Sequence, residues 1–279
     1  MPIGKDKMNL PERFSFSQQN LQDYVDCPYR FLLRHILQVE WPAVESEPVL
    51  LNEMRMELGQ RYHRLVQQYF AGIPAESLTE SIELPELLEW WKAFLDLKIQ
   101  TVPGEKFAEK LFSVPFEGSR LMAKIDLLLV QGDNQYRIYD WKTGAVQPTY
   151  QNLSRKLQTI VYPYVLTAFL TQNSAEVENF PEIEMIYWYP ASPNNPLQFI
   201  YSPQKFSQDQ RYLSNIVQQI KNAGREDFLK TSEEKKCRYC RYRSLCDRGI
   251  EAGTLSEEAS TLEGEDLFDL NFDDFQDFA

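Results

Sequence analysis

Hydrophobic side chains recur every three or four residues through much of the N-terminal part of the chain, which is the spacing of amphipathic helices. Ser17 is placed to cap the first helix, Pro28 suits the first turn of the second, and Asn52 is placed to cap the third. A fourth helix is expected in a stretch rich in Leu and Trp. The predicted helices cover residues 17–26, 29–37, 52–70 and 84–100.

The pattern then changes to the alternation that is typical of β-strands. Gly118-Ser119 is a two-residue turn of the kind that joins antiparallel strands, and residues 132–134 turn the chain again. Three adjacent antiparallel strands are therefore expected. They cover residues 107–117, 120–130 and 135–142.

Helices and strands continue to the end of the region with a core pattern. A kink is expected at Pro163, inside the next helix. The order of elements predicts a single α/β domain over residues 1–250, in which helices flank a mixed sheet. The remaining predicted helices are 151–171 and 204–222, and the remaining strands are 184–189 and 197–201.

Composition limits the class of protein. The chain has 279 residues, and its hydrophobic content of 43% is enough for a sizeable core. No apolar run reaches the roughly 18 residues that a membrane span needs, and residues 1–13 are too polar for a signal peptide. We therefore expect a soluble, cytoplasmic protein with no membrane partner.

The net charge of −12 is unevenly distributed. Residues 251–279 carry ten Asp and Glu and no Lys or Arg, so residues 1–250 have a net charge of about −2 (−12 + 10). A nearly neutral body can still present a basic strip to DNA. The candidate strip consists of Lys235, Lys236, Arg238, Arg241, Arg243 and Arg248.

Two aspartates on neighbouring predicted strands indicate a metal site. Asp140 and Lys142 share one face of a strand, and Asp126 on the adjacent strand can reach the same place. Carboxylates repel each other unless a cation lies between them, and oxygen ligands suit Mg2+ or Mn2+. Such a cation can activate water and orient a phosphodiester, while a nearby lysine stabilises developing charge. Alone, Asp140 and Lys142 could also be an ordinary ion pair at a strand end.

Two helical pairs extend this candidate site. Gly59 precedes His63 by one helical turn, off the centre of the apolar stripe of its helix. Gln158 precedes Tyr162 by one turn, so both lie on one helical face just downstream of the acidic strand. His35, the other histidine, has no comparable setting.

Four cysteines form a second candidate site. Cys27 stands alone near the N-terminus, and Cys237, Cys240 and Cys246 follow as a C-x2-C-x5-C cluster. In a cytoplasmic protein, such cysteines indicate metal binding or catalysis before disulfides. Four thiolates can hold either Zn2+ or a [4Fe–4S] cluster, although the isolated first cysteine differs from the paired C-x-x-C units of zinc ribbons. A closed site would tie two distant segments together.

In chain order, these motifs resemble those of RecB-like nucleases of the PD-(D/E)XK superfamily. The four cysteines and the run Cys27-Pro28-Tyr29-Arg30-Phe31 resemble its iron–sulfur branch, which includes the AddB nuclease domain and the CRISPR-associated RecB-like exonucleases. The resemblance spans roughly residues 15–250. It implies a restriction-endonuclease-like mixed sheet flanked by helices, with an iron–sulfur cluster that staples the N- and C-terminal helical parts.

The resemblance also implies roles. Lys142 would be the catalytic lysine, while Gln158 and Tyr162 would orient the site or contact DNA. A structural [4Fe–4S] cluster, rather than Zn2+, would occupy the four cysteines. The sequence departs from the family at Ala123, where Gly is frequent, and at Gln67, where some relatives have Glu. The ligands of Mg2+ or Mn2+ would be His63, Asp126, Asp140 and the backbone carbonyl of Trp141.

The function expected from these motifs is metal-dependent cleavage of DNA by an exonuclease that acts on single-stranded ends. The setting would be DNA repair, recombination or CRISPR adaptation. The chain has no GxxxxGK[ST] motif, so unwinding would require a partner helicase. The alternative is a catalytically weak DNA-binding or assembly subunit with a structural metal cluster, and a zinc-stabilised adaptor is a third interpretation.

The C-terminal residues 251–279 lack a periodic core pattern and are expected to be a disordered tail. Acidic and aromatic side chains alternate within 267–278. Three interpretations stay open: a solubilising tail, a peptide that docks on a partner protein, and a DNA mimic that folds back onto the basic strip.

Overall fold

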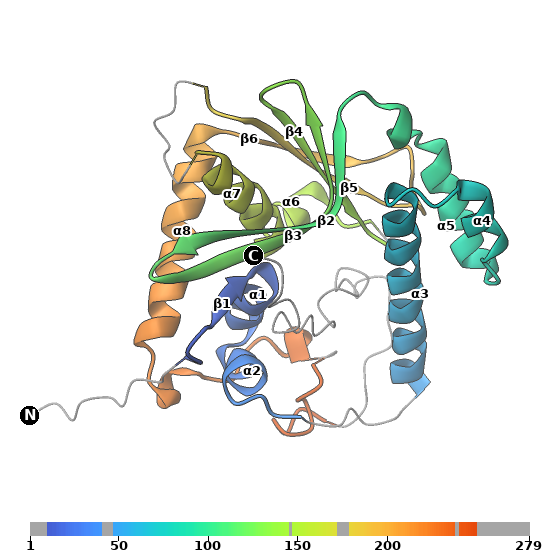
Figure 1. Ribbon diagram of the computed structural model, residues 1–279. Helices are drawn as coiled ribbons and strands as arrows, with labels where there is room; N and C mark the ends of the chain where they lie inside the picture. The colour runs from blue at the N-terminus through green and yellow to red at the C-terminus, as the bar shows by residue number, and fades with distance from the viewer. Residues whose placement is uncertain (1–9, 41–46, 145–146, 172–178, 238–239, 250–279) are drawn as a thin grey trace, which may run out of the picture.

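The computed structural model describes residues 10–40, 47–144, 147–171, 179–237 and 240–249. Among these residues, six strands form one mixed sheet, with helices on both sides of it (Figure 1). The strands are β1 (Ser15–Ser17), β2 (Glu105–Phe116), β3 (Ser119–Gln131), β4 (Gln135–Trp141), β5 (Glu182–Trp188) and β6 (Leu197–Tyr201).

The helices vary widely in length. Short 3-10 helices, at Ile99–Thr101, Arg225–Asp227 and Glu234–Cys237, and a π-helical turn at Leu32–Ile36 complete the described helical structure. The α-helices are α1 (Gln18–Asp26), α2 (Pro28–Phe31), α3 (Glu47–Phe70), α4 (Ala75–Glu80), α5 (Pro85–Asp96), α6 (Tyr150–Leu153), α7 (Leu157–Thr171) and α8 (Pro203–Asn222).

Strand β3 is the centre of the sheet. It pairs antiparallel with β2 on one side; on its other side it pairs first with β1, in parallel, and then with β4, antiparallel. Strand β5 pairs in parallel with β4, and β6 closes the order β1-β3-β4-β5-β6. A parallel pair needs a long crossover, and α6 and α7 supply it between β4 and β5.

Two hydrophobic cores cover the sheet. One contains α1, α7 and α8, and the other contains α3, α4 and α5. Every residue from 157 to 168 in α7 is buried, as expected for a helix that is apolar all round. The mixed sheet flanked by helices is thus confirmed as the fold class. None of the described helices is long and apolar enough to cross a membrane.

Several local predictions are confirmed. Ser17 caps α1 and forms a capping box, in which its side chain and that of Asn20 each accept a backbone hydrogen bond from the other residue. The predicted hairpin exists, and its turn has positive φ angles at Glu117 (48°) and Gly118 (68°). The turn residues are therefore Glu117-Gly118, one position earlier than predicted.

Other boundaries differ from the prediction. Helix α3 begins at Glu47, ahead of Asn52. The helix predicted over 151–171 is two helices, separated at residues 154–156, and α7 continues through Pro163. Helix α4 and the three-residue β1 were not predicted, because neither is long enough for a periodic pattern. Arg238 and the acidic tail lie outside the described residues.

Candidate active site and cysteine pocket

The helix that carries His63 approaches the sheet closely because of Gly59. A Cβ atom at Gly59 would lie 2.8 Å from Oγ1 of Thr143, closer than side chains normally pack. Helix α3 therefore packs against the segment that follows β4. His63 is one turn further along α3, which gives the spacing of Gly59 and His63 a structural reason.

Three carboxylate residues lie opposite one another on adjacent strands. The β2–β3 ladder pairs Ala108 with Leu127 and Lys110 with Ile125, and this register puts Glu109, which lies between those two pairs, opposite Asp126. The β3–β4 register, continued by one residue past its last pair, places Asp126 opposite Asp140. Directly opposed side chains share a face, with Cβ atoms about 5 Å apart. The sheet therefore carries a row of carboxylates, to which we refer as the acidic row.

Asp126 lies at the middle of the acidic row. Its Oδ2 accepts a hydrogen bond from the backbone N–H of Trp141 at 2.9 Å and is 3.6 Å from Nδ1 of His63. The N–H and C=O groups of one strand residue point toward the same neighbouring strand. The carbonyl of Trp141 thus faces the side on which Asp126 lies. The structure brings His63, Asp126 and the Trp141 backbone together.

Asp140 belongs to a buried hydrogen-bonded network. Its Oδ2 lies 2.8 Å from Nζ of Lys142, and its Oδ1 accepts a hydrogen bond from Nε2 of Gln158 at 2.7 Å. Lys142 in turn donates to Oε1 of Gln158 at 2.9 Å. The three side chains are 0%, 2% and 7% exposed, in the order Asp140, Lys142, Gln158. The network fixes the Asp140 carboxylate within the acidic row and the Lys142 ammonium group beside it.

Sequence reasoning missed Glu109. Its carboxylate, the imidazole of His63 and the carboxylate of Asp126 each offer a ligand atom, and these three atoms lie within 4.8 Å of one another. Glu109 also forms an ion pair with Lys124, Oε2 to Nζ 2.6 Å. A hairpin register counted from the correct turn would have placed Glu109 beside Asp126.

Two tyrosines near the site are buried. Burial raises the pKa of Tyr62 well above its usual value, and the negative charge of Asp126 raises it further, so the phenol stays neutral. Tyr162 lies one turn after Gln158 in α7 and is 3% exposed. This burial fits an orienting role for Tyr162 better than direct contact with DNA.

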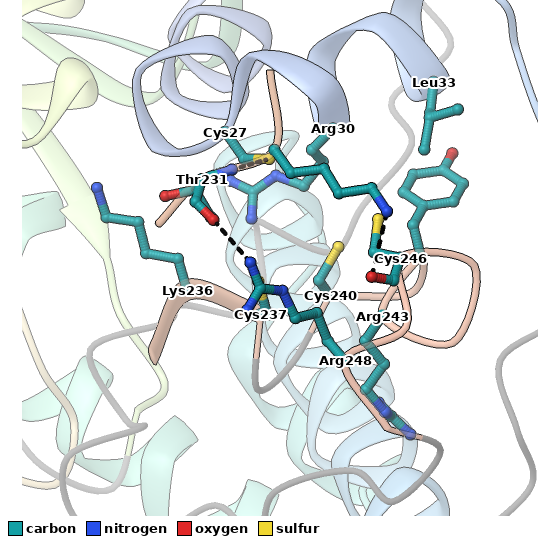
Figure 2. Close-up of a pocket in the computed structure, with 12 residues that line it drawn as sticks. Cys27, Arg30, Leu33, Thr231, Lys236, Cys237, Cys240, Arg243, Cys246 and Arg248 are labelled. Atoms are coloured by element: carbon teal, nitrogen blue, oxygen red, sulfur yellow. Dashed lines mark hydrogen bonds between the residues drawn. The ribbon is translucent and has the colours of Figure 1, made fainter. Parts of the chain in front are cut away.

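The four cysteines line one pocket, although Cys27 is 210 residues away from Cys237 in the sequence. Their side chains come from the α1–α2 junction and from the C-terminal segment, and they converge on a common space (Figure 2). The backbone N–H of Thr231 donates to Sγ of Cys27 at 3.4 Å. The predicted meeting of the two ends of the domain is therefore observed.

The surroundings of the cysteines suit a negatively charged metal centre. Burial raises the pKa of Cys237, Cys240 and Cys246, that of Cys240 to about 11. Burial alone thus disfavours thiolates, and a bound metal centre would reverse that preference. Positive side chains would balance the charge of four thiolates. Those that line the pocket are Arg30, Lys230, Lys236, Arg243 and Arg248.

The ligand set of the pocket suits two kinds of metal centre. Four thiolates can hold either a tetrahedral Zn2+ ion or a [4Fe–4S] cluster, and a backbone donor to the sulfur of Cys27 fits both.

Part of the predicted basic strip faces the pocket instead of solvent. Arg243 is 6% exposed and lines the pocket. Lys236 forms ion pairs with Asp26 and Glu233, Nζ to oxygen 3.4 and 3.0 Å, and Arg248 is paired with Glu234. These ion pairs hold the cations against the cysteine segment and its neighbours.

The mixed sheet, with its acidic row, buried lysine and a histidine from a flanking helix, defines a protein of the nuclease class. The sequence model of the PD-(D/E)XK nuclease superfamily matches residues 15–247, and the chain belongs to this superfamily. Its six-stranded mixed sheet fits the restriction-endonuclease-like fold. A comparison with curated protein sequences finds no match.

Two of the solved structures that are similar to this chain share about 10% of its residues. A protein from Eubacterium rectale, provisionally named an exonuclease, is 10% identical, with a TM-score of 0.48 over 75% of this chain and 81% of that one. The protein SSO0001 is 11% identical, with a TM-score of 0.34 over 85% of this chain and 88% of that one. Neither similarity is close enough to transfer an activity or a cofactor.

Proposed function

We propose that this protein is a metal-dependent deoxyribonuclease that hydrolyses phosphodiester bonds, acting as an exonuclease on single-stranded DNA ends. The observation that carries the proposal is the buried network of Asp140, Lys142 and Gln158 beside Asp126 and His63. Asp140 and Lys142 resemble the carboxylate and the lysine after which the PD-(D/E)XK superfamily is named, and the chain belongs to that superfamily.

Each side chain of the site has a chemical task in this proposal. His63, Asp126, Asp140 and the Trp141 carbonyl would hold Mg2+ or Mn2+. The bound cation supplies Lewis-acid stabilisation of the scissile phosphate and lowers the pKa of the attacking water. Water attacks phosphorus, the P–O bond to the leaving nucleoside oxygen breaks, and the products are a phosphate monoester and a free hydroxyl.

Lys142 and Gln158 act from the protein side. The ammonium group of Lys142 stabilises negative charge that develops on the phosphate oxygens, and its burial strengthens that interaction. Gln158 donates to Asp140 and accepts from Lys142, so it keeps the two charged groups at fixed positions. Such preorganisation costs no rearrangement at the moment of reaction.

We also propose that Cys27, Cys237, Cys240 and Cys246 hold a [4Fe–4S] cluster with a structural role. The convergence of the four side chains, the backbone donor to Cys27 and the surrounding cations support this assignment. The cluster would tie the α1–α2 junction to the C-terminal segment. Such a tie reduces the conformational freedom of the unfolded chain.

The biological setting is proposed from the resemblance of the motifs. It is DNA repair, recombination or CRISPR adaptation, with a helicase or another protein of these systems as partner. The acidic-aromatic tail is a candidate segment for docking such a partner.

The test of the nuclease is a cleavage assay with end-labelled single- and double-stranded DNA. The full chain, purified without oxygen, is compared in Mg2+, Mn2+ and EDTA, beside Asp140→Ala. Asp133→Ala is a matched control, because Asp133 is exposed at the β3–β4 turn of the same hairpin. We expect metal-dependent cleavage by the wild type and by Asp133→Ala, and none by Asp140→Ala.

The position of the label gives the polarity of cleavage. Cleavage that begins at ends of single strands supports the exonuclease assignment, whereas internal cuts in closed circular DNA would contradict it. DNA binding without metal and without cleavage, by protein that retains its cluster, would instead favour the DNA-binding or assembly subunit.

A further inference from the structure

We propose that Glu109 is a ligand of the active-site cation, so that His63, Glu109 and Asp126 form one binding position at the centre of the acidic row. The inference rests on the proposed function and extends its ligand set to a third strand, β2. No sequence motif identifies Glu109. Its assignment comes from the position of its carboxylate.

The three donor groups come from separate elements and converge. His63 projects from α3, Glu109 from β2 and Asp126 from β3, and their ligand atoms lie within 4.8 Å of one another. Around an octahedral Mg2+ with bonds of about 2.1 Å, adjacent ligands are about 3 Å apart and opposite ligands about 4 Å apart. Small side-chain rotations would therefore bring the three groups onto one cation.

The chemistry of the donor set favours a divalent cation. Glu109 and Asp126 offer carboxylate oxygens, and His63 offers an imidazole nitrogen. Mn2+ accepts this combination of ligands.

The ion pair with Lys124 does not by itself explain Glu109. Both side chains are partly exposed, 15% for Glu109 and 25% for Lys124, and ion pairs of this kind contribute little to stability. The backbone at Glu109 has φ of 52°, a left-handed conformation that an ordinary strand residue avoids. Coordination of a cation together with His63 and Asp126 would explain why this position has an unusual backbone conformation.

The test measures Mn2+ binding directly, by titration calorimetry and by the electron paramagnetic resonance signal of free Mn2+. It uses the full chain, purified without oxygen, as wild type, Glu109→Gln, Glu105→Gln and Lys124→Gln. Glu105 lies on the same strand and is exposed, so Glu105→Gln makes the same charge change away from the site. Thermal melts establish that each variant is folded.

We expect Glu109→Gln to weaken Mn2+ binding at least about tenfold, because one charged ligand is lost. Glu105→Gln should bind as the wild type does, and Lys124→Gln should bind equally well or more tightly, because it removes a nearby positive charge. If Glu109→Gln does not fold, Glu109→Asp keeps the charge and withdraws the carboxylate, and it should also weaken binding.

Two results would overturn the proposal. One is a folded Glu109→Gln variant that binds Mn2+ as tightly as the wild type. If only Glu109→Asp folds, the same result in that variant would overturn the proposal. The other is equal weakening in Glu109→Gln and Lys124→Gln, which would mean that the ion pair only shapes the site. The nuclease is judged separately by cleavage. If the wild type cleaves DNA and Glu109→Gln binds Mn2+ as tightly as the wild type, only the assignment of Glu109 as a ligand is refuted. If Mn2+ binding depends on Glu109 but the wild type does not cleave DNA, only the proposed nuclease activity is refuted.

Discussion

Lys142 and Asp140 form an ion pair that is almost completely shielded from water, with Nζ 2.8 Å from Oδ2 and exposed side-chain fractions of 2% and 0%. Burying two charges costs desolvation energy that their attraction does not reliably repay. A pair of apolar residues could fill the same volume without that cost. The pair is therefore better explained by chemistry at the acidic row than by stability.

This relationship leads to a prediction about stability and activity together. Asp140→Ala should lower the free energy of unfolding by about 3 kcal/mol or more, because it leaves a buried ammonium group without its carboxylate. The double variant Asp140→Ala/Lys142→Met should regain most of the lost free energy of unfolding. It should still not cleave DNA. Urea unfolding without added divalent metal measures the first effect, and the DNA assay measures the second. A double variant as unstable as Asp140→Ala would contradict the explanation.

Gln158 is expected to act as a positioning residue. Gln158→Leu keeps the size of the side chain but removes its hydrogen bonds to Asp140 and Lys142, so we expect kcat to fall by about 10- to 100-fold while KM changes little. Mn2+ affinity should change less than kcat does. The matched control is Gln151→Leu, at an exposed position of α6. A rise in KM with an unchanged kcat would show that Gln158 binds DNA instead.

The fold and the principal residues of the candidate site follow from local sequence patterns. Strand alternation is enough to put Asp140 and Lys142 on one face, and a helical turn relates Gln158 to Tyr162. The hairpin register was harder. With the turn at Gly118-Ser119, Asp126 faces Leu111; with the observed turn at Glu117-Gly118, the pairing moves by two residues and Glu109 faces Asp126.

The setting of His35 could not be predicted from the sequence because it depends on tertiary contacts. Its Nε2 lies 2.7 Å from Oδ2 of Asp23, and Arg30 and Arg34 contact the same carboxylate. These residues lie in the short helices on either side of Cys27. Spacing along the chain does not show which of their side chains will contact Asp23. The three-residue strand β1 could not be predicted from the sequence for another reason, since it is defined only by its pairing with β3.

Loss of one cysteine is expected to remove the cluster and destabilise the domain. Cys246→Ser should lack the visible absorbance of a [4Fe–4S] cluster, contain little iron or acid-labile sulfide, and melt at a lower temperature, because the tie between the two chain segments is broken. Thr231→Ala is the control, since it keeps the backbone N–H that contacts Cys27. One equivalent of zinc and no iron in the wild type would refute the cluster assignment.

Asp23 provides a prediction about pH. Burial raises the pKa of Asp23, but Arg30, His35 and Arg34 together outweigh it and hold the pKa below its ordinary value of 3.8. A folded-state pKa below the unfolded value stabilises the fold above pH 3.8, and the contribution disappears as pH falls through the folded-state pKa. At neutral pH, Asp23→Asn should lower the free energy of unfolding by about 3 kcal/mol, because Arg30 and Arg34 lose a buried carboxylate partner. Urea unfolding between pH 7 and pH 3 should show this difference shrinking at the acid end. Asp96→Asn, at an exposed position of α5, should match the wild type throughout. A difference that stays constant down to pH 3 would show that the loss comes from packing, and not from the charge of Asp23.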